Sequence, residues 1–328
     1  MQPIKATIII PTYDHGPLLS YAVNCARQQT ISNIEIFIVG DCVPDNTRAL
    51  AASLTQEDPR IRFFDNREKD PRVGELYRNQ ALTEAQGEII CYLSDDDLWL
   101  PNHVASMYEL LKHAEFANSI PVIIQPHGLI QVSPVDLAQP YFRQHILTNN
   151  NRIPLTFAAH TLEAYKQLPN GWQTTPKNSY SDHHMWKQFL QHSHFRATSG
   201  NSVTAINFPS ATRKQWTVEK RLEELAFWQR ELQNPQGLEQ IKQRIFESCW
   251  RLMTWYEACY EGKINQLQTQ HEASYEGKIN LLQTQLDNMT NSQDWKIYKK
   301  LMAIPLLPRL IRAGYKISAK CKHALSYK

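Results

Sequence analysis

Short apolar runs alternate with segments of helical spacing along the first 130 residues of the chain. The apolar runs predict four buried strands, at residues 6–11, 34–41, 60–65 and 87–93. The segments between them predict helices at residues 17–29, 45–54 and 74–86. Strands that alternate with helices form mostly parallel sheets covered on both faces. The pattern therefore predicts an α/β domain, in which ligands bind beyond the carboxyl ends of the strands.

Polar residues gather at the ends of these predicted strands. Pro11, Thr12 and Tyr13 end the first strand, Asp41 ends the second, and Asp95, Asp96 and Asp97 follow the fourth. Because parallel strands end at the same edge of a sheet, we expect these residues to converge. Adjacent carboxylates repel one another and cost stability unless a cation lies among them. A solvated turn that caps the next helix is the simpler interpretation, but one Asp would suffice for it.

The sequence has neither of the glycine-rich loops that commonly bind phosphates, GxGxxG or GxxxxGK[ST]. The absence of both motifs argues against a Rossmann dinucleotide site and against a P-loop. It also argues against a nucleotidyltransferase that makes activated sugars, because such an enzyme would begin with a glycine-rich loop carrying Arg and Lys. A phosphate ligand would instead be neutralised by a divalent cation that carboxylates hold.

Three stretches of the chain resemble, in order, the motifs of family 2 glycosyltransferases, the inverting enzymes of GT-A fold. They are IIIPTYDHGPLLSYAVNCARQQTISNIEIFIVGD, RNQALTEAQGEIICYLSDDDLWLP and GWQTTPKNSYSDHHMWKQF. The resemblance covers roughly residues 5 to 200. It implies a mostly parallel nucleotide-binding sheet flanked by helices and a nucleotide-sugar donor, with a UDP-sugar favoured. It also implies a Mg²⁺ or Mn²⁺ ion that bridges the donor's diphosphate.

The resemblance also assigns roles to single residues. It places Pro11, Thr12, Tyr13, Asp41 and Asp95 at the nucleotide, and Asp96 and Asp97 at the metal. Asp41 would accept a hydrogen bond from the base. Arg72 and Arg78 fall on the segment where the family often places a cation near the diphosphate. An exposed loop arginine and a helix-face arginine are the alternative interpretations for these two residues.

The chemistry requires one further carboxylate. Displacing a nucleoside diphosphate from an anomeric carbon needs a base that takes the proton of the acceptor hydroxyl. The resemblance assigns this role to Asp182, in the stretch SDHHMWKQF. The alternative is a plain helix cap, since Ser181 and Asp182 precede a helical run. Both can hold, because a helix N-terminus favours an ionised carboxylate.

Histidines and tryptophans are frequent around this stretch. The histidines are His183, His184, His192 and His194. No Cys or carboxylate stands at ligand spacing from them, so we expect at most a substrate contact and no zinc site. For Trp172 and Trp186 the sequence leaves two interpretations open, core packing and stacking on a sugar.

After residue 210 long amphipathic helical patterns follow. We divide the chain into a GT-A domain at 1–210, a helical extension at 211–259, a repeat-containing segment at 260–290 and a tail at 291–328. In the third segment YEGKINQLQTQ, at 260–270, returns as YEGKINLLQTQ, at 275–285. Its heptad-like apolar spacing predicts a short coiled coil that would mediate self-association. A solvated helical spacer is the alternative, because Gly262 and Gly277 weaken a helix.

The net charge of +3 is unevenly spread. Residues 294–328 carry nine Lys or Arg against one Asp, a local +8, so the remainder of the chain carries −5. On a helical wheel the basic residues of this tail lie opposite Trp295 and other apolar residues. Basic amphipathic helices of this kind bind anionic membrane surfaces. Docking on the protein's own domain is the alternative, and the confinement of the positive charge to the tail argues against nucleic acid.

The cysteines and the apolar runs bear on location. The six cysteines form no CxxC pair, no run approaches 18 apolar residues, and the N-terminus lacks a signal-peptide pattern. We therefore expect a cytoplasmic protein that the tail holds on the inner face of the membrane.

The function that these features predict is that of an inverting, metal-dependent hexosyltransferase. It would move a sugar to a hydroxyl of a glycan or lipid-linked acceptor in cell-surface polysaccharide synthesis. The alternative is a non-catalytic scaffold with a decayed transferase domain. The presence of both Asp96 and Asp182 favours the enzyme.

Overall fold

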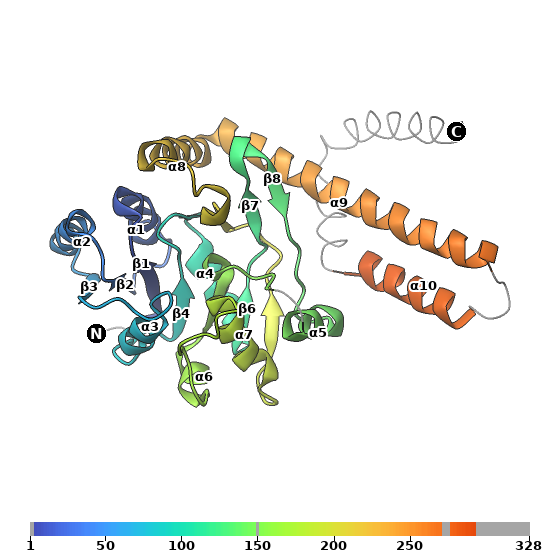
Figure 1. The fold of residues 1–328 in the computed structure, drawn as a ribbon, viewed down its shortest axis with the longest axis horizontal. Helices are drawn as coiled ribbons and strands as arrows, with labels where there is room; N and C mark the ends of the chain where they lie inside the picture. Colours follow the sequence, from blue (N-terminus) through green and yellow to red (C-terminus); the bar gives the residue numbers. More distant parts are fainter. Residues whose placement is uncertain (1–2, 149–150, 271–275, 293–328) are drawn as a thin grey trace. The chain divides into compact units, whose positions relative to one another are not determined.

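The computed structural model describes residues 3–148, 151–270 and 276–292 (Figure 1). Its centre is a seven-stranded sheet in the order β10-β6-β9-β4-β1-β2-β3. The strands are β1 (Ala6–Thr12), β2 (Ile34–Asp41), β3 (Ile61–Asn66), β4 (Ile89–Tyr92), β6 (Phe116–Asn118), β9 (Ala158–Thr161) and β10 (Ala197–Ser199). Neighbouring strands are parallel except where β9 pairs with β4 and β6. The mostly parallel sheet predicted from the apolar runs is confirmed.

Helices cover this sheet, as the alternating pattern predicts. The first four are α1 (Leu19–Arg27), α2 (Asp45–Glu57), α3 (Glu75–Leu82) and α4 (His103–Leu111). Helix α1 contacts β1, α3 contacts β2, and α4 contacts β4, β6 and β9. Every residue of β2 and β4 is buried, which is why both strands are rich in apolar residues.

Two short antiparallel pairs extend the domain beyond the main sheet. Strand β5 (Leu98–Trp99) pairs with β11 (Ala205–Ile206), and β7 (Val122–Ile124) pairs with β8 (Ile130–Val132). The helices of this part are α5 (Pro140–Thr148), α6 (Leu162–Gln167) and α7 (Ser181–Gln191). Because β5 follows the three aspartates directly, its pairing with β11 brings residues 207–210 back beside them.

A hydrogen-bonded aromatic cluster fills the core between β4, β9 and α7. The indole of Trp172 donates to the Tyr92 hydroxyl at 2.9 Å, and Tyr92 lies 2.7 Å from Nε2 of His160. The other nitrogen of His160 lies 2.9 Å from the Thr161 carbonyl. Trp172 and Trp186 are 1% and 0% exposed, so the structure supports core packing for both and not sugar stacking.

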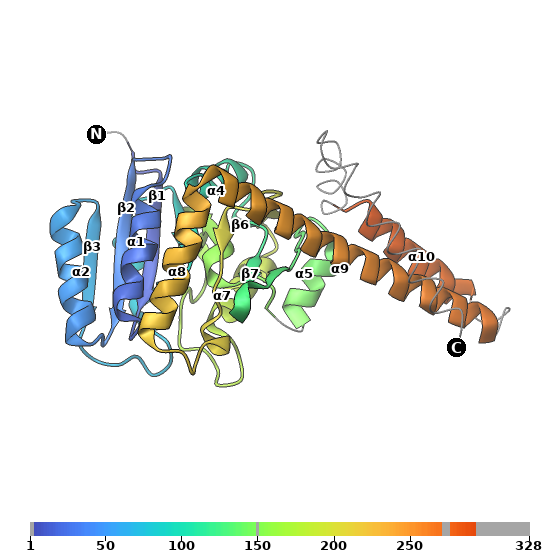
Figure 2. The same ribbon diagram turned by 90° about the horizontal axis from the view of Figure 1, so that it is seen from above.

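The chain continues as three helices, α8 (Val218–Gln233), α9 (Pro235–Gln270) and α10 (Glu276–Thr290). Helix α8 lies beside the short turn η1 (Gly16–Leu18) that precedes α1 (Figure 2). Backbone contacts divide the chain into two compact units between Ile245 and Phe246. A helical C-terminal region follows the sheet domain, as the sequence predicts. Helix α9 includes both the end of the predicted helical extension and the first copy of the repeat.

The two copies of the repeat lie on different helices. The first ends α9 and the second falls on α10, with residues 271–275 outside the described part of the chain. The coiled coil across them stays a prediction. The basic tail at 294–328 also lies outside the described residues. Among the helices that the structure describes, none combines the length and the apolar character needed to cross a membrane.

Candidate active site

The carboxyl ends of β1, β2 and β4 meet at one edge of the sheet. Thr12 stands opposite Gly40 in the β1–β2 register, and Ile9 stands opposite Tyr92 in the β1–β4 register. The edge therefore collects the side chains that the sequence singles out at strand ends. Thr12 is buried with no hydrogen-bond partner for its hydroxyl among the described residues, whereas Tyr13 is 45% exposed and Pro11 is half-buried.

Asp95 and Asp96 form a cluster with a histidine that the sequence analysis did not select. His15 Nδ1 lies 2.6 Å from Asp95 Oδ1. One ligand atom from each of His15, Asp95 and Asp96 lies within 4.8 Å of the others. Asp95 Oδ2 is buried and has no partner among the described residues. Two carboxylates and an imidazole suit Mn²⁺, and the carboxylates suit Mg²⁺, so these residues fit the implied cation.

The charge of His15 reflects this cluster. Burial by itself lowers the pKa of the imidazole, but the charge of Asp95 and the hydrogen bond to it, with the charge of Asp96, raise the pKa to about 9. Without a bound cation, His15 therefore serves as the counterion of the two carboxylates, and its imidazole would coordinate a metal ion only after losing this proton. Its position in PTYDHGP carries no metal-ligand spacing, so the sequence offered no signal for it.

Asp96 and Asp97 differ in their surroundings although they are adjacent. Asp96 accepts a hydrogen bond from the Ser210 hydroxyl at 2.5 Å and forms an ion pair with Arg221 of α8. Burial raises the pKa of the Asp96 carboxyl. The sequence analysis missed Ser210 and Arg221, which lie more than 100 positions away along the chain.

Asp97 is turned away from this cluster and is fully buried. It accepts hydrogen bonds from the Phe208 backbone N–H at 2.8 Å, from the Asn207 amide at 3.0 Å and from the Thr156 hydroxyl. Burial, and next the charge of Asp96, raises the pKa of Asp97 to about 7 despite these donors. Its contacts join the aspartate loop to the segment after β11, and it lies outside the His15 cluster.

Asp41 orders the turn that follows β3. Its carboxylate pairs with Lys69 and accepts the Asp70 backbone N–H at 2.7 Å. Gly74 has a φ of +77°, and a Cβ there would stand 3.3 Å from the Asp41 Cβ. Lys69 also lies 3.5 Å from the centroid of the Tyr13 ring. Asp41, the predicted contact of the nucleotide base, thus lies near the Lys69 ammonium, the Tyr13 ring and the tight turn at Gly74.

The two predicted arginines occupy different positions. Arg72 is half-buried, and its guanidinium donates to the Ser179 carbonyl at 3.3 Å while its Nε is buried without a described partner. Arg78, on α3, is only 4% exposed, so it is not an exposed helix-face arginine. It stacks 4.2 Å from the centroid of the Trp172 ring and donates from Nη1 to the Val73 carbonyl. Its Nε and Nη2 are buried and have no partner among the described residues.

Asp182 lies in the first turn of α7 and is half-buried. Tyr180 occupies the N-cap position, and Asp182 accepts the His183 backbone N–H at 2.8 Å. Burial raises the pKa of Asp182 to about 6, against the opposing effects of that N–H and of the Arg78 charge. A carboxyl group with this pKa is ionised at neutral pH and still basic enough to accept a proton.

The histidines around α7 form no metal site within the described residues. His183 Nε2 lies 2.6 Å from the Ile146 carbonyl, and His184 lies 3.0 Å from the Gln173 side chain. Over the described ranges the geometry supports one cluster of possible metal ligands, that of His15, Asp95 and Asp96.

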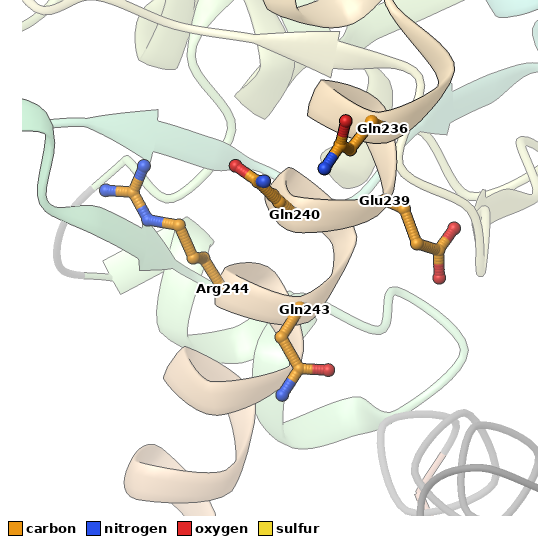
Figure 3. A pocket seen from close by; sticks show the side chains of 5 residues that line it. All are labelled: Gln236, Glu239, Gln240, Gln243 and Arg244. Carbon is orange, nitrogen blue, oxygen red and sulfur yellow. The ribbon is translucent and has the colours of Figure 1, made fainter.

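A shallow hollow of about 460 Å³ lies on α9, away from these residues (Figure 3). It is lined by Gln236, Glu239, Gln240, Gln243 and Arg244. All five side chains come from one helix, and Arg244 turns aside to donate to the Gly128 carbonyl. The hollow lacks the convergence of several elements that is typical of ligand sites, and we assign it no part in the active site.

Comparisons with known proteins identify the family of the sheet domain. Residues 7–167 match Glycosyl transferase family 2, and this domain of the chain belongs to that family. The GalNAc(5)-diNAcBac-PP-undecaprenol beta-1,3-glucosyltransferase of Campylobacter jejuni is 29% identical over 107 residues, 32% of this chain and 34% of that protein. The UDP-Glc:alpha-D-GlcNAc-diphosphoundecaprenol beta-1,3-glucosyltransferase WfgD of Escherichia coli is 29% identical over 111 residues, 34% of this chain and 42% of that protein. The chain thus spans less than half the length of these curated relatives.

A solved structure supports the fold. The crystal structure of S. aureus TarS 1-349 in complex with UDP-GlcNAc superposes with a TM-score of 0.51 at 15% identity, over 62% of this chain and 58% of that one. The likeness extends to the GT-A fold and not to the ligand. This likeness confirms the predicted fold. The family match confirms the predicted family and indicates a transferase enzyme.

Proposed function

We propose that this protein is a metal-dependent inverting hexosyltransferase. It moves a sugar from a nucleoside diphosphate donor, with a UDP-sugar favoured, to a hydroxyl of a glycan or lipid-linked acceptor in cell-surface polysaccharide synthesis. The observation that carries the proposal is a set of buried polar atoms with no described partner around one edge of the sheet. They are Thr12 Oγ1, Arg72 Nε, Arg78 Nε and Nη2, and Asp95 Oδ2. A buried unpaired group costs about 1–3 kcal/mol, so a polar ligand that pairs with several of them would be strongly favoured.

The donor's diphosphate accounts for the charges of this edge. Asp95 and Asp96, with His15, would hold a Mg²⁺ or Mn²⁺ ion. When bound, the ion neutralises the diphosphate and the charge that develops on it as the sugar leaves. Arg78 offers two buried N–H groups to an anion, and the Trp172 ring fixes the plane of its guanidinium. Thr12, Tyr13 and Asp41 are the candidate contacts of the nucleoside.

Asp182 performs the proton transfer in the proposed reaction. The acceptor hydroxyl donates its proton to the Asp182 carboxylate while its oxygen forms a bond to the anomeric carbon. The bond from that carbon to the diphosphate oxygen breaks, and the electron pair stays on the phosphate. Attack on the face opposite the leaving group inverts the anomeric configuration. The raised pKa of Asp182, about 6, suits a base at neutral pH.

The acceptor is the less constrained partner. Two relatives are named as glucosyltransferases acting on diphosphoundecaprenol-linked sugars, which supports a lipid-linked acceptor. We propose that the basic tail holds the enzyme at the inner face of an anionic membrane, beside such an acceptor.

A screen of nucleotide-sugars tests the function. The full chain would be incubated with UDP-, GDP- and dTDP-sugars in Mg²⁺, in Mn²⁺ and in EDTA, and donor hydrolysis and melting temperature would be measured. We expect one nucleotide class to raise the melting temperature only when the divalent ion is present. Protection by no donor in any metal would favour the non-catalytic scaffold instead.

A further inference from the structure

Helix α8 places a cation on the carboxylate of Asp96. Arg221 Nη2 forms an ion pair with Asp96 Oδ2 and lies 3.2 Å from the Ser210 hydroxyl, which itself donates to the same carboxylate oxygen. The Arg221 and Asp96 side chains are only 12% and 7% exposed. An ion pair this sheltered from water is stronger than one at the surface, so it holds the guanidinium at the cluster.

A second ion pair, formed by a fully buried arginine, fixes α8 in this position. Arg213, whose side chain is 0% exposed, forms two hydrogen bonds with Glu224 of α8, at 2.6 and 2.7 Å. Arg213 also donates to the Ile124 carbonyl of β7 at 2.9 Å. Glu224 follows Arg221 by three positions, which is less than one helical turn. Arg221 is therefore presented by an anchored helix and not by a free loop.

A divalent ion bound by Asp95 and Asp96 would compete with this guanidinium. Both described side-chain hydrogen bonds of Arg221 are made by Nη2, and among the described residues Nε and Nη1 have no hydrogen-bonded partner. A cation bound by Asp96 weakens the ion pair between Asp96 and Arg221. Its positive charge also repels the Arg221 guanidinium. The guanidinium then needs another anion, and its planar edge matches the paired oxygens of a diphosphate.

We propose that Arg221 exchanges partners during the reaction cycle: it neutralises Asp96 while no donor is bound, and it binds the donor's diphosphate once the cation occupies the cluster. This role rests on the proposed function. In the transfer step the bond between the anomeric carbon and the diphosphate oxygen breaks, and the leaving nucleoside diphosphate gains one negative charge. Arg221 stabilises the transition state, in which that charge develops, more than it stabilises the ground state. The leaving group therefore departs faster.

The exchange predicts effects of opposite sign in one variant, Arg221→Gln. Removing the competing cation should tighten the binding of Mn²⁺ alone by severalfold. Removing the diphosphate contact should weaken the binding of UDP, measured in saturating Mn²⁺, by roughly tenfold to hundredfold, as expected for one charged hydrogen-bonding group. UMP binding should change by less than about threefold, because the second phosphate is missing. Isothermal titration calorimetry measures all three, with GDP and GMP replacing UDP and UMP if the wild type prefers guanosine.

Two further variants keep the test specific. Lys220→Gln removes the same charge from the neighbouring position of α8, where the ammonium lies 4.1 Å from the centroid of the Trp216 ring. It should leave Mn²⁺ and UDP binding near the wild-type values. Arg221→Lys keeps the charge without the planar edge, so it should bind Mn²⁺ like the wild type and UDP with intermediate affinity. Melting curves of each variant check that the domain is folded.

The outcomes separate this role from the proposed function. If the wild type binds UDP or GDP with Mn²⁺ and folded Arg221→Gln binds it equally well, the partner exchange is wrong while the transferase stands. Equal weakening of UDP and UMP, or an unchanged affinity for Mn²⁺ alone, would also overturn it. A wild type that binds no nucleoside diphosphate in any metal would overturn both.

Discussion

The carboxylates at the edge of the sheet differ in how far the protein satisfies them. Asp97 has three kinds of donor around it and is fully buried, so it braces the loop. Asp95 keeps a buried oxygen with no hydrogen-bond partner among the described residues, and Asp96 is held by groups that a ligand can displace. A satisfied carboxylate stabilises the fold, whereas an unsatisfied buried one costs stability and is retained for binding.

At this scale we predict that Asp96→Asn abolishes the metal dependence of donor binding. The amide keeps the size of the side chain but removes the charge that holds the cation, so the diphosphate loses its counterion. Calorimetry with UDP in Mn²⁺ and in EDTA would then give the same weak binding in both. Asp45→Asn, the same change on a fully exposed side chain, is the control. Undiminished metal-assisted binding by Asp96→Asn would contradict the assignment.

We also predict that Asp182→Asn separates binding from chemistry. The variant should bind the donor normally and lose transfer by roughly 10² or more, because a general base acts on the acceptor. Donor affinity and single-turnover transfer would be compared, with Glu163→Gln on α6 as the exposed control. Near-normal turnover would show that Asp182 is not the base and only stabilises the start of α7.

The pH dependence of transfer follows from the same residue. Burial raises the pKa of Asp182 to about 6, and only the ionised carboxylate accepts a proton. The rate in the wild type should therefore be level at neutral pH and fall as the pH drops through about 6, approaching tenfold for each further pH unit. A rate that stays level well below pH 6 would exclude Asp182 as the base.

At the scale of elements, glycines mark where the backbone is constrained and where it is not. Gly171 has a φ of +58°, and a Cβ there would come within 2.6 Å of the Tyr165 hydroxyl. Its turn supports Trp172, on which Arg78 stacks. Gly262 lies inside α9, and no described atom lies within 4 Å of an added Cβ.

These two positions should respond oppositely to alanine. Gly171→Ala should lower the free energy of unfolding by about 1–3 kcal/mol through backbone strain and the clash. Gly262→Ala should stabilise α9 by about 0.5–1 kcal/mol because it reduces the entropy of the unfolded chain. Urea unfolding monitored by circular dichroism measures both. Similar shifts in the same direction would contradict the local backbone conformations.

At the scale of the molecule, residues 1–293 carry a net charge of −5 and the tail at 294–328 carries +8. Each Lys or Arg near an anionic bilayer adds about 1 kcal/mol of attraction, which salt weakens. Deletion of residues 294–328, which lie outside the described part, should release the protein from anionic vesicles and preserve donor hydrolysis. Co-sedimentation at low and high salt, beside an activity assay, measures this. Vesicle binding that does not change with lipid charge or with salt concentration would refute the membrane role.

The sequence by itself determined four of the seven strands of the main sheet, the helices between them, and which residues follow the ends of those strands. Continuous apolar runs are buried strands wherever both faces of a parallel sheet are covered, and their carboxyl ends must meet at one edge. The aspartates after β4 and the carboxylate at the start of α7 could therefore be identified from the sequence alone. So was the family, because its motifs are local in sequence.

Only the tertiary structure decided which groups share that edge. His15, Ser210 and Arg221 reach Asp95 and Asp96 through the β1–β4 register, the β5–β11 pairing and the Arg213–Glu224 anchor. None of these three residues stands at a recognisable spacing from the aspartates. The same holds for the contrast between Asp96 and Asp97, which lie in the turn between β4 and β5 and bind partners from different distant segments. Contacts between distant segments depend on packing, and packing is not a periodic property of the chain.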